Sequence, residues 1–150
     1  MVEHLQTSER MMTLLYEAMT QYGLREIPGP QHESQILKFS KELGYPFDTD
    51  EVSWCGIFMS AMCKRAGLVY PDKGYSARSW LKWGDAVDVP VTGDVVVFWR
   101  VSPNSWQGHV GIFVNYTKGG DFINVLGGNQ SNKVGVNAYD ASKVLGFRRL

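Results

Sequence analysis

The sequence is poor in the residues that build metal centres and disulfide frameworks. It has 2 cysteines and 3 histidines among 150 residues. The cysteines, Cys55 and Cys63, form no CxxC pair, and their spacing does not match a zinc motif. We therefore expect neither a metal ion nor another cofactor.

An excess of charge of one sign is also lacking. The chain has 15 basic and 15 acidic residues, so its formal net charge is zero, and no overall basic surface for nucleic acid or an anionic membrane is expected. No stretch approaches ~18 apolar residues, and no basic segment followed by an apolar run opens the chain. These absences predict no nucleic-acid partner, no membrane insertion, and synthesis in the cytoplasm without a signal peptide.

What the sequence does contain is a change of hydrophobic period along the chain. Apolar residues at helical spacing predict helices over Ser8–Tyr22, His32–Gly44 and, after Ser53, to about Ala66. Beyond Val89, five runs of β-branched and aromatic residues predict strands near 95–100, 109–116, 122–126, 134–137 and 144–149. Short connections favour antiparallel pairing. The order predicts an α+β domain, with N-terminal helices packed on an antiparallel sheet of about five strands.

Cys55 is the first candidate for chemistry. It follows Ser53, a suitable helix N-cap, and so falls in the first turn of a predicted helix. The partial positive charge at a helix N-terminus favours the thiolate and thus a nucleophilic cysteine. The alternative is a small buried residue. Cys63, eight residues later and ~12 Å away on the same helix, is too far for a disulfide and is predicted to be core.

His109 is the histidine best placed to act with Cys55, because it begins a predicted strand after a loop. A cysteine at a helix start and a histidine at a strand start can form a thiolate–imidazolium nucleophile if folding brings them together. The imidazole needs a third polar group to fix its tautomer. Asn129 is the first choice, with Gln130 and Asn124 as alternatives, and a structural role for His109 stays open.

Five blocks, in this order, resemble those of the NlpC-like and CHAP-like papain-fold cell-wall hydrolases, in particular a small single-domain subgroup of bacteria and phages. They are Ser53–Phe58, Ser76–Trp80, Thr92–Phe98, Gly108–Ile112 and Leu126–Gln130. The resemblance implies a papain-like core over 28–150, preceded by a helix and connector over 1–27. It also implies that Cys55 is the nucleophile, His109 the general base and Asn129 the third residue. Gly127 departs from the pattern, because CHAP-like enzymes often have an acidic residue there.

The resemblance further implies hydrolysis of an amide bond in peptidoglycan, between stem-peptide residues or at the bond to muramic acid. The protein would act on the cell wall after release or delivery, as a phage lysin, a tail-associated enzyme or an exported toxin, and an immunity protein or a holin would be its partner. One oxyanion donor would be the Cys55 N–H, with Ser53 and Gln130 as candidates for the second.

Several residues are candidates for a substrate groove that holds sugar rings and a peptide carboxylate. They are Trp54, Tyr75, Arg78, Trp99, Trp106 and Gln130. A packing or solvated role is the alternative for each aromatic residue and for Arg78, and Asp94 is predicted to be a turn residue. Two other functions fit the same fold: a catalytically silent wall-binding or virion structural module, and an acyltransferase that uses the same cysteine and histidine.

Overall fold

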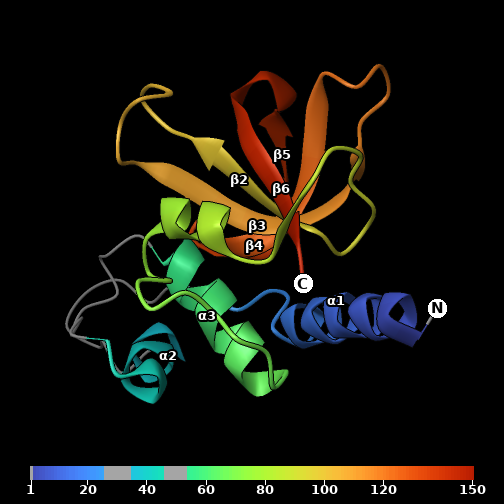
Figure 1. Ribbon diagram of the computed structural model, residues 1–150. Helices are drawn as coiled ribbons and strands as arrows, with labels where there is room; N and C mark the ends of the chain where they lie inside the picture. Colours follow the sequence, from blue (N-terminus) through green and yellow to red (C-terminus); the bar gives the residue numbers. More distant parts are fainter. Residues whose placement is uncertain (1, 26–34, 46–53) are drawn as a thin grey trace.

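The computed structural model describes residues 2–25, 35–45 and 54–150, and in these residues three helices lie on one side of a six-stranded sheet (Figure 1). The helices are α1 (Val2–Thr20), α2 (Gln35–Leu43) and α3 (Cys55–Arg65), with the short 3-10 helices η1 (Ala77–Lys82) and η2 (Ala141–Lys143). The strands are β1 (Asp85–Val87), β2 (Val95–Trp99), β3 (Gly108–Tyr116), β4 (Phe122–Gln130), β5 (Lys133–Asp140) and β6 (Val144–Arg149).

The sheet has the order β1-β6-β2-β3-β4-β5, and each neighbouring pair is antiparallel. The predicted α+β architecture is therefore confirmed. The sixth strand, β1, was not predicted, since three residues carry too little alternation to be recognised.

Helix α3 forms the centre of the core. Every residue from Cys55 to Cys63 is buried, as expected for a helix that is apolar around most of its circumference. It packs against α2 on one side and against β3 and β4 on the other. Cys63 is fully buried, which confirms its predicted core role. The helix ends as predicted, with Ala66 as its C-cap and Gly67 at φ +74°.

The sheet is apolar on both faces and curls on itself. Side chains alternate along β2: Val97 joins the core beneath the helices, whereas Phe98 joins a second apolar cluster on the opposite face. The Phe98 ring stacks on Tyr139 of β5 at 5.2 Å. Strands β2 and β5 are three positions apart in the sheet, roughly 14 Å if it were flat. The curl therefore brings β5 over the start of β3.

Two element boundaries differ from the predictions in ways that matter locally. Helix α1 already begins at Val2, so Ser8 lies within it and is not its cap. Strand β4 continues to Gln130, where the sequence predicted a loop after Leu126. A bulge makes this possible: the pairing with β5 shifts between Gly127 and Gln130, and Asn129 adopts φ +58°. Ser53 and His32 lie outside the described residues.

Candidate active site

Cys55 is the first residue of α3, as the sequence predicted, and Trp54 is the N-cap. The residue is only 3% exposed. The helix start is pressed against the 74–75 segment, because a Cβ on Gly56 would collide with the Gly74 carbonyl oxygen. Glycine at position 56 thus allows the close approach that fixes where Cys55 lies.

The start of α3 also touches the end of β4 through a second glycine. A Cβ on Gly128 would lie 2.7 Å from the Trp54 ring and 2.8 Å from the Cβ of Phe58. Trp54 and Phe58 flank Cys55 on the helix, so the cysteine lies beside the strand end that carries Asn129 and Gln130. Trp54 is 1% exposed, and its predicted place in a substrate groove is wrong because its ring fills this helix–strand contact.

His109 lies near the start of β3, opposite Phe98 of β2, and is buried. Its Nε2 is 3.0 Å from Oε1 of Gln130. The Gln130 amide nitrogen donates one hydrogen bond to the Val125 carbonyl, at 2.9 Å, and another to the Gly135 carbonyl, at 2.5 Å. With both amide hydrogens engaged, Oε1 must face the imidazole and can only accept. The neutral ring therefore carries its proton on Nε2, and Nδ1 is left as a hydrogen-bond acceptor.

Gln130 is thus the residue that orients the imidazole, a role predicted first for Asn129. Gln130 was also predicted to contact substrate, but at 1% exposed it cannot line a groove. The bulge in β4 explains why Gln130 and not Asn129 contacts His109. It turns the side chain of Asn129 to the surface of a cleft and that of Gln130 inward. Asn124, the other alternative, donates to Asn115 at 2.8 Å.

Tyr139 is a site residue that the sequence analysis missed. Its ring stacks on the His109 ring with centroids 4.6 Å apart and planes at 14°. Burial raises the pKa of the Tyr139 hydroxyl, the Cys55 thiolate raises it further, and Arg100 opposes both. Tyr139 is thus stacked on the imidazole and lies within electrostatic range of Cys55. No sequence signal identifies it, because only the curl of the sheet brings β5 to His109.

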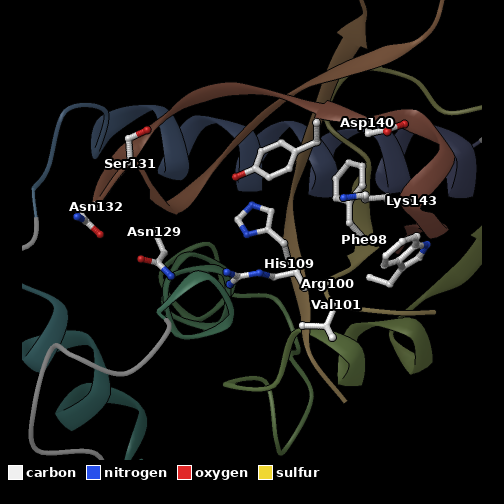
Figure 2. A pocket seen from close by; sticks show the side chains of 11 residues that line it. Phe98, Arg100, Val101, His109, Asn129, Ser131, Asn132, Asp140 and Lys143 are labelled. Carbon is white, nitrogen blue, oxygen red and sulfur yellow. The ribbon is translucent and has the colours of Figure 1, made fainter. Parts of the chain in front are cut away.

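An open cleft of about 580 Å³ lies beside His109 (Figure 2). Its wall consists of Phe98, Trp99, Arg100, Val101, His109, Asn129, Ser131, Asn132, Tyr139, Asp140 and Lys143. The predicted groove residue Trp99 is among them. Tyr75, Trp106 and Cys55 itself are not part of the wall that the described residues form. Trp106 is instead 80% exposed, and Tyr75 packs edge-on against Tyr45 with ring centroids 5.0 Å apart.

Arg78, another predicted groove residue, holds the loop between β2 and β3. Its guanidinium donates to the carbonyls of Gln107, Pro103 and Ser102 at 2.8–3.0 Å and to the Ser105 hydroxyl at 3.4 Å. With its donors used in this way, its role here is to shape the loop, and the expectation that it binds substrate is not supported.

Asp94 has the structural role that was predicted for it. Its carboxylate is fully buried and accepts two hydrogen bonds of 2.7 Å from Arg149 of β6. It also accepts from the Val91 N–H at 2.7 Å, which closes the turn before β2. Asp94 therefore links the entry of β2 to the C-terminal strand.

Solved structures with a similar fold include two bacterial proteins. One is a P60 domain from an antigen of M. avium paratuberculosis, with a TM-score of 0.57 at 14% identity, covering 100% of this chain and 99% of that one. The other is a Staphylococcus aureus protein described as similar to lipoprotein, NLP/P60 family, with a TM-score of 0.52 at 16% identity, covering 94% of this chain. The chain has an NlpC/P60-like fold. It spans 41% of the length of the staphylococcal protein.

Comparisons by sequence add no further likeness, since no family model and no curated protein matches the chain. Within the described residues, no helix combines the length and apolar character needed to cross a membrane. Nor does that part of the chain hold a group of three or more His, Cys, Asp or Glu side chains arranged for a metal ion.

Proposed function

We propose that this protein is a cysteine hydrolase that cleaves an amide bond in, or next to, the stem peptide of peptidoglycan. The observation that carries the proposal is the orientation of His109. Gln130 holds its Nε2–H and leaves Nδ1 as an acceptor, beside a helix that begins at Cys55. An unprotonated Nδ1 is the atom that a general base needs in order to take the proton of a thiol.

In the proposed reaction, Nδ1 of His109 takes the proton of the Cys55 thiol, and the sulfur attacks the amide carbonyl carbon. The C–N bond breaks, the imidazolium gives its proton to the leaving amine, and a thioester remains on Cys55. Water then attacks the thioester and passes a proton to His109, the C–S bond breaks to release the acid, and the imidazolium returns its proton to the Cys55 sulfur. The Cys55 N–H, in the first turn of α3, would stabilise the oxyanion.

Peptidoglycan as substrate is supported by the resemblance of the motif blocks to NlpC-like and CHAP-like wall hydrolases and by the shared fold. We place the protein outside the cytoplasm after release or delivery, as a phage lysin, a tail-associated enzyme or an exported toxin. A holin or an immunity protein would be its partner in these contexts.

The test is digestion of purified walls by the wild type, Cys55→Ala and His109→Ala, followed by mass spectrometry of the released muropeptides. We expect both variants to lose clearing while their melting temperatures stay close to the wild-type value, and the new peptide ends identify the bond. Cys63→Ala is the matched control, because Cys63 is a core thiol and its variant should still cleave. Undiminished clearing by Cys55→Ala would refute the mechanism.

One observation favours a second function, a binding module without catalysis. Cys55 is 3% exposed and does not contribute to the cleft wall formed by the described residues. A protein of this kind would bind walls through the cleft and release no peptides from them. The reactivity of the Cys55 thiol separates the two functions.

A further inference from the structure

The charged side chains of the cleft are not balanced. Arg100 and Lys143 contribute two positive charges to the wall, and Asp140 contributes one negative charge. The Asp140 carboxylate is already engaged, because its Oδ1 accepts from the Ser142 N–H at 2.9 Å and from the Ser142 hydroxyl at 2.7 Å. It caps η2 in this way. Asp140 keeps its negative charge and interacts electrostatically with Lys143, so the excess positive charge of the cleft is that of Arg100.

Arg100 shares the cleft wall with His109. Phe98 pairs directly with His109, and Arg100 follows two residues later, so its side chain is expected on the same face of the sheet. Its N–H continues the ladder with a 3.3 Å hydrogen bond to the Gln107 carbonyl. Figure 2 shows its guanidinium beside the His109 ring, directed toward Asn129. Within the described residues, neither recorded ion pair includes Arg100.

The backbone next to Arg100 is held in an uncommon conformation. Val101 has φ +67° although it is β-branched, a conformation that surrounding structure must enforce. Arg78 supplies part of that constraint by binding the carbonyls of Ser102 and Pro103. Lys143 is also positioned, since its ammonium lies 5.1 Å from the centre of the Trp99 ring. Arg100 and Lys143 thus extend from parts of the cleft wall whose conformation is constrained by neighbouring residues.

We propose that Arg100, assisted by Lys143, forms an anion subsite that binds a free carboxylate of the peptide substrate next to the bond that is cut. A guanidinium has a planar pair of N–H donors that matches the two oxygens of a carboxylate. Because Arg100 has no ion pair within the described residues, none is broken when a carboxylate binds to it. The inference rests on the proposed function. It predicts that the substrate is an acidic peptide. The distance from its free carboxylate to the scissile carbonyl should be no greater than the length of an arginine side chain.

Binding without turnover tests this directly. In the Cys55→Ala background, muropeptide monomers released from purified walls are titrated by calorimetry, either with free carboxylates or after chemical amidation. We expect amidation to weaken binding roughly 10- to 100-fold, as for loss of a charge-assisted hydrogen bond. Arg100→Gln should weaken binding of the free acid by most of this factor, and amidation should then have only the small further effect left to Lys143. Arg100→Lys should retain part of the affinity.

Lys118→Gln is the matched control. Lys118 is exposed in the turn between β3 and β4, so this substitution also removes one positive charge, but away from the cleft. Equal binding of the acid and the amide, or an Arg100→Gln variant that binds like Lys118→Gln, overturns the subsite. The hydrolase proposal is tested separately, by whether the wild type cleaves the walls. Binding that depends on Arg100, without any cleavage, would support the subsite and refute the hydrolase.

Discussion

The two thiols of the chain should differ greatly in reactivity, and this difference decides whether Cys55 is a nucleophile. Burial raises the pKa of Cys63 to about 12, so that only ~10⁻⁵ of it is thiolate at pH 7. An ordinary thiol of pKa ~8.5 is about 3% thiolate at that pH. Cys63 should therefore react roughly three thousandfold more slowly than an ordinary thiol, and its burial slows it further. Any label incorporated at neutral pH reports on Cys55.

The assay is alkylation by iodoacetamide between pH 5 and 8, followed by intact-mass spectrometry and peptide mapping. We expect one label per chain, at Cys55, with a rate that persists below pH 7 because the thiolate is paired with the imidazolium. Cys55→Ala should take up no label, and His109→Ala should show the steep loss of rate toward low pH of an ordinary thiol. Labelling of Cys55 only in denaturant would refute the reasoning, and the cleft would then serve a silent binding module.

Three further predictions follow from hydrogen bonds and burial. Gln130→Ala leaves the His109 Nε2–H without its buried acceptor, so turnover should fall about 100-fold and the free energy of unfolding by about 1–3 kcal/mol. Single-turnover kinetics and urea unfolding measure the two effects. Unchanged turnover would contradict the orienting role. Asp94→Ala breaks a pair that is buried on the Asp94 side and partly exposed on the Arg149 side. It should cost about 2–3 kcal/mol in urea unfolding, less than a fully buried pair, while activity per folded molecule stays the same; a variant as stable as the wild type would count against this. Burial raises the pKa of Tyr139, so the unfolded chain releases this proton first and stability falls above pH ~10. Tyr139→Phe should abolish up to about 0.8 kcal/mol of the loss at pH 10.5, measured against pH 8, and an identical pH dependence in the variant would refute it.

The parts of the site that depend on local sequence were predictable. A polar segment followed by an apolar run indicated a helix start at Cys55, and the helix begins there. A β-branched run after a loop indicated that His109 opens a strand, and β3 begins one residue earlier. The order of helices and strands then sufficed for the α+β fold. These features are set by neighbours along the chain, which is why periodicity and capping reveal them.

The parts that depend on distant contacts were not predictable. Trp54 was expected in a groove, but its burial depends on Gly128, which lies on another element. Tyr139 belongs to the site only because the sheet curls and brings β5 over β3. A bulge that offsets the side chains by one position cannot be read from alternation, so the order of Asn129 and Gln130 as partners of His109 was inverted.

The length of the Gln130 side chain is itself part of the arrangement. Its amide oxygen contacts His109, and its amide nitrogen donates to the carbonyls of Val125 and Gly135. Shortening it by one methylene in Gln130→Asn would withdraw the amide by roughly 1.5 Å, about half a hydrogen-bond length, and all three contacts could not be kept. Exchanging residues 129 and 130 would not repair the site, because position 129 adopts φ +58° and faces the cleft. The tautomer of His109 therefore depends on a glutamine at the end of the bulge, and an asparagine in either position cannot replace it.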